Sequence, residues 1–152
     1  MAELTNREVI ERFVDAMNAA ELDQAEQYLA VDVIEDYPQS RERIRGRANR
    51  RAVVENYPGR AERDFVPGKV GTIVGDDQWV MTPTLSLLRL SGSGERFTVT
   101  GEIVYPNGER WHVIQLMEVH DSKIAKMRTY FAAPFEPAPY RAKLVERMPA
   151  EE

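Results

Sequence analysis

Hydrophobic residues near the start of the chain recur at the spacing of a helix that is buried on one side. These residues are Val9, Ile10, Phe13, Val14 and Met17. Thr5 and Glu8 precede them at the spacing of a capping box, in which the two side chains satisfy free backbone N–H groups of the first turn. The pattern therefore predicts an amphipathic helix over residues 5–19.

Two more helices and a strand are predicted before residue 60. Residues 22–29 place apolar positions on one side of a short helix, and residues 31–37 form a short strand. Gly46 precedes a third helical stretch over residues 47–56. That helix must stop near Pro58, because proline disfavours helical geometry in the residue before it.

From residue 65 onward the hydrophobic period changes to that of strands. Clusters of glycine, serine, asparagine and aspartate separate the runs, which is typical of hairpin connections. The predicted strands are residues 65–74, 78–90, 96–105, 110–120 and 124–131. Asn107-Gly108 is the strongest turn signal, because a two-residue type I′ turn needs positive φ at both central positions.

This order of elements predicts an α+β fold. Three N-terminal helices are expected to cover one face of a bent sheet that is mixed or antiparallel. Residues 111–119 are apolar on both sides of their strand, which is more than one covered face requires. We therefore expect a homodimer that buries the outer face of the sheet.

Composition adds limits to this picture. The 152 residues predict a single domain over residues 1–152, with a proline-containing tail from about residue 134. The lack of cysteine excludes disulfide scaffolds, thiol nucleophiles and cysteine-based metal sites. The net charge of −5 argues against nucleic acid as the main partner. No stretch has the length of a signal region or membrane span, so we expect a cytoplasmic protein with no membrane partner.

Several segments resemble the SnoaL-like branch of the nuclear transport factor 2-like superfamily. They are VIERFVDAMNAAELDQAEQYL, VIEDYP, the glycine before the third helix and the ending SKIAKMRTYF. The resemblance covers nearly the whole chain. It implies a cone-shaped, curled sheet wrapped around three helices, a deep apolar pocket and dimerisation through the outer sheet face. Such proteins include polyketide cyclases, ketosteroid isomerases, dehydratases, epoxide hydrolases and plain binding modules, so the fold alone does not fix the function.

The resemblance to ketosteroid isomerases points to Asp36, which matches the position of their general base. A carboxylate at the mouth of an apolar cone can move a proton at a carbon next to a carbonyl. The alternative is that Asp36 only caps the turn before Pro38. The two oxyanion donors of those isomerases are not reproduced, because Phe13 and Gln115 stand at the matching positions. Losing one donor costs on the order of a hundredfold to a thousandfold in rate, so ordinary ketosteroid isomerisation is not expected.

A two-residue turn at Asn107-Gly108 would fix which residues face each other across the hairpin. Glu102 is then opposite Val113 and shares a face with Gln115. If that face lines the pocket, Glu102 supplies a second carboxylate near Asp36, and two nearby carboxylates raise the pKa of at least one of them. The alternative is that the two faces are swapped, or that Glu102 lies at an open rim.

Further side chains are expected to complete the pocket wall, with simple core packing as the alternative. These candidate substrate-binding residues are Phe13, Tyr28, Tyr37, Tyr57, Trp111, Met127, Thr129 and Phe131. His112 is expected on the face opposite Gln115, at the dimer interface. Neither histidine has carboxylates at metal-ligand spacing, so we expect no metal and no cofactor.

Arginine is concentrated between residues 41 and 63, where it far outnumbers aspartate and glutamate. Such a patch can guide an anionic ligand toward the pocket mouth. It can equally pair with acidic groups of the same protein or of its dimer mate.

The sequence therefore predicts a protein that binds a small, largely apolar organic molecule in a deep pocket. The first hypothesis is an enzyme that isomerises, cyclises or dehydrates a carbonyl compound. In it, Asp36 is the proton shuttle, Gln115 and Tyr37 donate hydrogen bonds, and Glu102 is a second carboxylate. The rival hypothesis is a non-catalytic small-molecule-binding or dimeric interaction domain, which an Asp36 turned to solvent would favour.

Overall fold

The computed structural model describes residues 2–56, 66–74, 79–81, 87–89, 94–104 and 108–149. Its helices are α1 (Asn6–Asn18), α2 (Leu22–Glu26) and α3 (Arg47–Glu55), with a 3-10 turn at Pro139–Arg141. Its strands are β1 (Leu29–Tyr37), β2 (Glu42–Arg45), β3 (Val66–Val74), β4 (Trp79–Met81), β5 (Leu87–Arg89), β6 (Arg96–Val104), β7 (Arg110–His120) and β8 (Lys123–Ala132).

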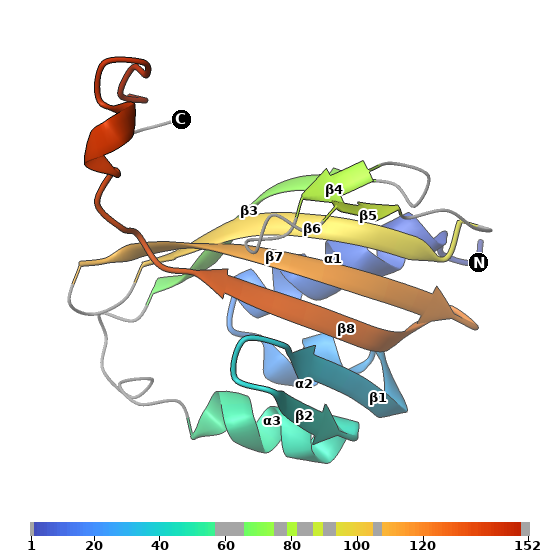
Figure 1. The fold of residues 1–152 in the computed structure, drawn as a ribbon. Helices are drawn as coiled ribbons and strands as arrows, with labels where there is room; N and C mark the ends of the chain where they lie inside the picture. The colour runs from blue at the N-terminus through green and yellow to red at the C-terminus, as the bar shows by residue number, and fades with distance from the viewer. Residues whose placement is uncertain are drawn as a thin grey trace.

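One curved sheet organises the molecule, in the strand order β2-β1-β8-β7-β6-β3. Strands β1 and β8 are parallel, and the other neighbours are antiparallel, so the sheet is mixed. Figure 1 shows α1 lying across one face of this sheet, with α2 and α3 beside β1 and β2. The predicted α+β fold, with helices on one face of a bent sheet, is confirmed.

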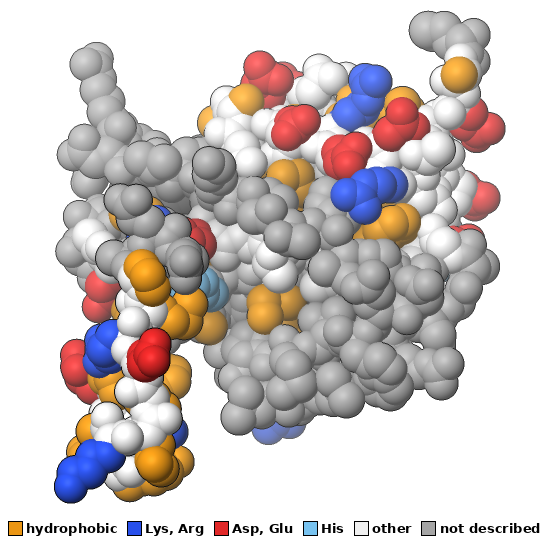
Figure 2. All heavy atoms as spheres, turned by 90° about the horizontal axis from the view of Figure 1, so that it is seen from above, with side chains coloured by type: hydrophobic (Ala, Val, Ile, Leu, Met, Phe, Trp, Pro, Cys, Tyr) orange, Lys and Arg blue, Asp and Glu red, His pale blue; other side chains and the backbone are white. Residues whose placement is uncertain are grey.

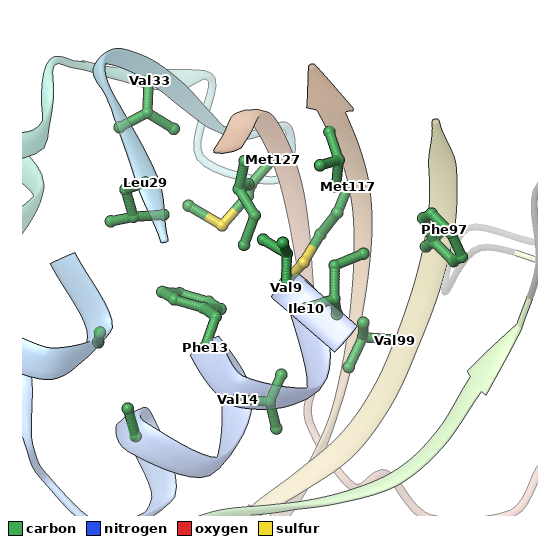
Figure 3. Packing of buried hydrophobic residues seen from close by; sticks show 14 residues of the cluster. Val9, Ile10, Phe13, Val14, Leu29, Val33, Phe97, Val99, Met117 and Met127 are labelled. Atoms are coloured by element: carbon green, nitrogen blue, oxygen red, sulfur yellow. The ribbon is translucent and has the colours of Figure 1, made fainter. Parts of the chain in front are cut away.

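Helix α1 begins as its sequence predicts. The Thr5 side chain accepts from the Glu8 backbone N–H at 3.2 Å, and the Glu8 carboxylate accepts from the Thr5 backbone N–H at 2.8 Å. The predicted apolar stripe points inward: Val9, Ile10 and Phe13 lie against Met117 and Met127 of the sheet (Figure 3). This contact between helix and sheet forms the apolar core.

The segment after α1 differs from its predicted form. The helix predicted over residues 22–29 ends at Glu26, and Leu29 is already the first residue of β1. Leu29 is buried in β1, and a buried apolar residue suits a helix as well as a strand, so its hydrophobicity could not reveal where the helix ends. The predicted helix at 47–56 is confirmed as α3.

Strand β2 has no counterpart in the predicted elements. It pairs with β1 at the edge of the sheet, where Arg43 lies opposite Asp36. Charged residues and exposed side chains dominate Glu42–Arg45. An edge strand tolerates such residues because one of its sides is not covered by another strand. The hydrophobic pattern therefore gave no signal for β2.

The single strand predicted over residues 78–90 is wrong. Two short strands, β4 and β5, occupy its ends and pair antiparallel with Trp79 opposite Arg89. The chain must reverse direction between them. Pro83 falls inside the predicted run, and proline argues against a continuous central strand because it has no N–H for the ladder.

The predicted register of the β6–β7 hairpin is also wrong, by one residue. Glu102 lies opposite His112, and Val104 lies opposite Arg110. Five residues, 105–109, therefore lie between the last paired residues, Val104 and Arg110. A two-residue turn would require an even number of residues between any two partners. Gly108 does have the expected positive φ, at 84°, whereas Asn107 lies outside the described residues. The slip changes which residues of β6 share a face with those of β7.

The C-terminal tail leaves the sheet after β8. Figure 1 shows it extending away from the sheet, and in Figure 2 it stands apart from the body with hydrophobic side chains on its surface. Among them, Phe135 and Leu144 are each 84% exposed. The tail therefore does not run along the described surface of its own chain.

Candidate functional site

A cavity of about 680 Å³ lies between α1, α3 and the face of the sheet that the helices cover. Most of its wall is apolar or aromatic. The main wall residues are Phe13, Met17, Tyr37, Val53, Val54, Val99, Ile103, Trp111, Val113 and Phe131. A few polar side chains also line it, and four of them are connected: Glu35, Arg50, Gln115 and Thr129. An apolar cavity with few polar groups is the usual form of a small-molecule site.

The four polar side chains form one hydrogen-bonded chain. Gln115 Nε2 donates to Thr129 Oγ1 at 3.3 Å, and that hydroxyl donates to Glu35 Oε1 at 2.9 Å. Arg50 Nε donates to the other carboxylate oxygen, Glu35 Oε2, at 2.9 Å. Both oxygens of Glu35 are therefore held by the protein.

Backbone geometry explains how Glu35 and Arg50 meet. Val33 and Glu35 are two residues apart in β1, so both side chains point to the helix-covered face. Gly46 has a φ of 87°, which L side chains rarely adopt, and its N–H donates to Val33 O at 2.8 Å. This bond fixes the start of α3 against β1. Arg50, one turn into that helix, then reaches Glu35.

The Glu35–Arg50 pair is almost completely removed from solvent. The side chains are 4% and 9% exposed. The Arg50 guanidinium also lies over the ring of Phe13, 5.1 Å from its centroid, a cation–π geometry. Buried charges are tolerated when they are paired and hydrogen-bonded, and this pair meets both conditions.

Asp36, the predicted proton shuttle, does not line this cavity. Its side chain is mostly buried, but it points to the opposite face of the sheet, where Arg43 binds it twice, at 2.6 and 2.9 Å. These hydrogen bonds hold the pKa of Asp36 below its usual value. The predicted position of Asp36 in the pocket is therefore wrong, and the carboxylate in the cavity belongs to the preceding residue, Glu35.

The prediction that Glu102 shares a face of the hairpin with Gln115 is wrong as well. Gln115 does line the cavity, opposite Val99 of β6. Glu102 borders the cavity, but its carboxylate accepts from Arg110 at 2.8 Å and lies 3.9 Å from His112, on the outer face. The cause is the one-residue slip in the hairpin register. Alternation within β7 is unaffected by that slip, so the side chains of His112 and Gln115 point to opposite faces of the sheet, as predicted.

The predicted wall residues divide into three groups. Five of them line the cavity: Phe13, Tyr37, Trp111, Thr129 and Phe131. Met127 is fully buried in the apolar core, and Tyr28 packs against that core, so neither belongs to the wall. Tyr57 lies outside the described residues.

Glu35 and Arg50 are the site residues that the sequence reasoning missed. A signal existed for each. Glu35 follows the apolar Val33 by two residues, and Arg50 precedes the apolar Val53 and Val54 by a helical turn. Both charged residues therefore share a face with apolar ones, a pattern typical of a polar group buried in a pocket wall.

Three of the six described arginines of the arginine-rich segment pair with acids of their own chain. Arg43 binds Asp36, Arg50 binds Glu35, and Arg51 binds three acids around α2 and α3. The hydrogen bonds that Arg51 donates to those acids raise its pKa. For these three arginines, this favours the structural explanation over guidance of an anionic ligand.

Two further features are absent from the described part of the chain. There, no group of three histidine, aspartate or glutamate side chains could hold a metal ion. No helix among the described residues is long and apolar enough to cross a membrane.

Solved structures support the fold assignment. An NTF-2 like protein of unknown function from Burkholderia xenovorans LB400 is 27% identical, with a TM-score of 0.69 and 95% of each chain covered. A presumed ketosteroid isomerase from Kribbella flavida is 26% identical, with a TM-score of 0.72, and the match covers 96% of this chain and 91% of that one. A presumed polyketide cyclase from Pseudomonas putida, at 20% identity and a TM-score of 0.58, shares the fold over 84% of this chain and 92% of its own.

Sequence comparison gives the family. None of the curated proteins matches the chain. The SnoaL-like domain matches residues 10–127, which is well over half of the chain and includes most of α1, the Glu35–Arg50 pair and most of the sheet. The protein therefore belongs to the SnoaL-like domain family, within the nuclear transport factor 2-like fold.

Proposed function

We propose that the cavity binds a small, largely apolar organic molecule that carries an oxygen at one end. The observation behind this proposal is the distribution of polarity along the wall. Aromatic and aliphatic side chains form most of it, whereas Glu35, Arg50, Gln115 and Thr129 form one connected polar patch. Such a wall removes apolar ligand surface from water and fixes the orientation of a single polar end.

Proton transfer to and from a carbonyl compound is the reaction that best fits this patch, with Glu35 in the role predicted for Asp36. In such a step a C–H bond next to the carbonyl breaks and its proton moves to Glu35. The electron pair of that bond moves toward the carbonyl oxygen, giving an enolate. When the ketone has a neighbouring carbon–carbon double bond, the enolate extends over it, and return of the proton to the far carbon completes an isomerisation; removal of the same proton also begins a cyclisation or a dehydration.

A second candidate is binding without catalysis, and the Arg50 contact favours it. Arg50 donates to Glu35 Oε2, and the Thr129 hydroxyl donates to Glu35 Oε1. Both oxygens that would have to approach a ligand proton are therefore already held by the protein. The cavity would then hold its ligand without changing it.

Exchange of carbonyl-adjacent protons in D₂O separates the two candidates. We suggest 4-tert-butylcyclohexanone and 2-tetralone as ketones, with loss of the α-proton signal followed by NMR and binding measured by equilibrium dialysis. The enzyme predicts exchange that falls at least about a hundredfold in Glu35→Gln. The matched control is Asp36→Asn, one residue away on the other face, which should exchange like the wild type. Bound ketone with no exchange above buffer identifies the non-catalytic binder.

We further propose that the protein is a homodimer through the outer face of the sheet. Ile114 and Leu116 of β7 point to that face and are only half-buried. Light scattering should give the mass of two chains, and Ile114→Lys should shift it toward that of one, because it places a charge in an apolar interface. A wild-type protein with the mass of a single chain would contradict this.

A further inference from the structure

We propose that Arg50 is the residue that binds the oxygen of the ligand, and that it selects an uncharged oxygen acceptor, such as a ketone, over a carboxylate. This inference rests on the proposed function, because it assumes that the cavity binds a small molecule. It assigns to Arg50 a role beyond its pairing with Glu35.

The guanidinium of Arg50 has unused hydrogen-bond donors. Its Nε is taken by Glu35, and its Nη1 has only the sulfur of Met17, at 3.9 Å. Within the described part of the chain, Nη2 has no hydrogen-bond partner. Arg43 shows the difference, since it uses both Nε and Nη2 on the carboxylate of Asp36.

The other polar groups of the patch offer weaker donors than the guanidinium, because one N–H of the neutral Gln115 amide and the Thr129 hydroxyl are already used within the patch. The hydroxyl of Thr129 donates to Glu35, and the amide of Gln115 donates to Thr129. Glu35, as a carboxylate, has no donor at all. A carbonyl oxygen that reaches this patch therefore finds its best donor in Arg50.

Arg50 is held in place before any ligand arrives. Glu35 fixes one edge of the guanidinium and the ring of Phe13 covers its face. The side chain is only 9% exposed. Little conformational freedom remains to be lost on binding, so a hydrogen bond to a ligand gives more of its strength as affinity.

The charges around the cavity disfavour an anionic ligand. Arg50 is the sole positively charged residue among the described wall residues, and Glu35 already balances it. Glu42 adds negative charge to the wall, whereas the carboxylate of Glu102 is paired with Arg110 on the outer face. A carboxylate would leave water for an apolar cavity with an excess of negative groups, whereas a ketone has no charge to desolvate.

Three probes on one scaffold test this inference: 2-acetylnaphthalene, 2-ethylnaphthalene and 2-naphthoate, which differ in the polar end alone. Equilibrium dialysis gives their affinities for the wild type, Arg50→Lys and Arg43→Lys. In Arg50→Lys the ammonium can still pair with Glu35, but the free guanidinium edge is gone. Arg43→Lys makes the same change in the pair outside the cavity and is the matched control.

The wild type should bind 2-acetylnaphthalene about tenfold more tightly than 2-ethylnaphthalene, as expected for one hydrogen bond from a charged donor. It should bind 2-naphthoate more weakly than either. Arg50→Lys should lose the preference for the ketone and keep its affinity for 2-ethylnaphthalene, while Arg43→Lys should match the wild type.

Each contrary result has its own meaning. A ketone preference that survives in Arg50→Lys would overturn the assignment of Arg50. Binding of 2-naphthoate as tight as that of the ketone would overturn the charge selection. A wild type that binds none of the three probes would instead contradict the proposed function itself.

Discussion

Two neighbouring residues of β1 make the same kind of contact on opposite sides of the sheet. Glu35 pairs with Arg50 in the cavity, and Asp36 pairs with Arg43 outside it. The arginines differ in exposure, at 9% for the Arg50 side chain and 47% for that of Arg43. The contacts also differ in form, with one hydrogen bond from Arg50 and two from Arg43.

The difference shows that the pair with more hydrogen bonds is not the pair with more capacity to bind a ligand. The Asp36–Arg43 pair satisfies both carboxylate oxygens and is solvated on the arginine side, so it joins β1 to the edge strand β2. The Glu35–Arg50 pair is buried and leaves donors of Arg50 unused. An incomplete pair next to a cavity has groups left to bind a ligand.

The largest expected effect comes from removing the cations of the two pairs in turn. Arg50→Met leaves the carboxylate of Glu35 buried without its partner and should lower the free energy of unfolding by about 3–5 kcal/mol. Arg43→Met should cost much less, because water can replace an exposed guanidinium. Urea unfolding followed by circular dichroism measures both. Equal losses would contradict the comparison.

A smaller effect is expected from two threonines on opposite faces of the sheet. Thr129→Val removes a hydroxyl that donates to Glu35 and accepts from Gln115, and should lower the free energy of unfolding by about 1–3 kcal/mol. Thr98 is the matched control. Among the described residues, its Oγ1 is the one fully buried side-chain polar atom without a hydrogen-bond partner.

Thr98→Val should therefore be neutral or stabilising, because it replaces an unsatisfied buried hydroxyl with a methyl group of similar shape. The same urea titrations measure it. If Thr98→Val and Thr129→Val lowered the free energy of unfolding equally, the hydrogen bonds of Thr129 to Glu35 and Gln115 would make no net contribution to stability.

Sequence patterns predicted the elements well where one side of an element is buried. The capping box fixed the start of α1, and alternation fixed β6, β7 and β8. The same patterns missed β2, whose charged residues lie at a sheet edge, and they joined β4 and β5 into one strand. Hydrophobic periodicity reflects burial, so it gives no signal for a strand such as β2, whose side chains are mostly exposed.

The site was harder to predict because it depends on contacts between distant elements. One residue decides which carboxylate of β1 faces the cavity, and the resemblance to ketosteroid isomerases pointed to Asp36. The position of Glu102 depended on an assumed turn length, and an odd connection moved it to the other face. The Arg50–Glu35 contact joins α3 to β1 through the turn at Gly46, which no local pattern specifies.

The smallest expected effect concerns pH and the outer pair alone. The hydrogen bonds of Arg43 lower the pKa of Asp36 in the folded protein. The folded state therefore binds the proton of Asp36 less readily than the unfolded state, whose aspartate pKa is about 3.9. The resulting contribution to the free energy of unfolding is fully present above that value and is lost as the pH falls through the lowered pKa of the folded state.

Asp36→Asn removes this contribution, so urea unfolding between about pH 5 and pH 2 should show a shallower loss of stability in the variant than in the wild type. Glu8, whose pKa is lowered by hydrogen bonds from Thr5, titrates in both proteins and does not affect their difference. Parallel curves would mean that the Asp36–Arg43 pair adds nothing to stability, and that the contrast between the two pairs lies in burial alone.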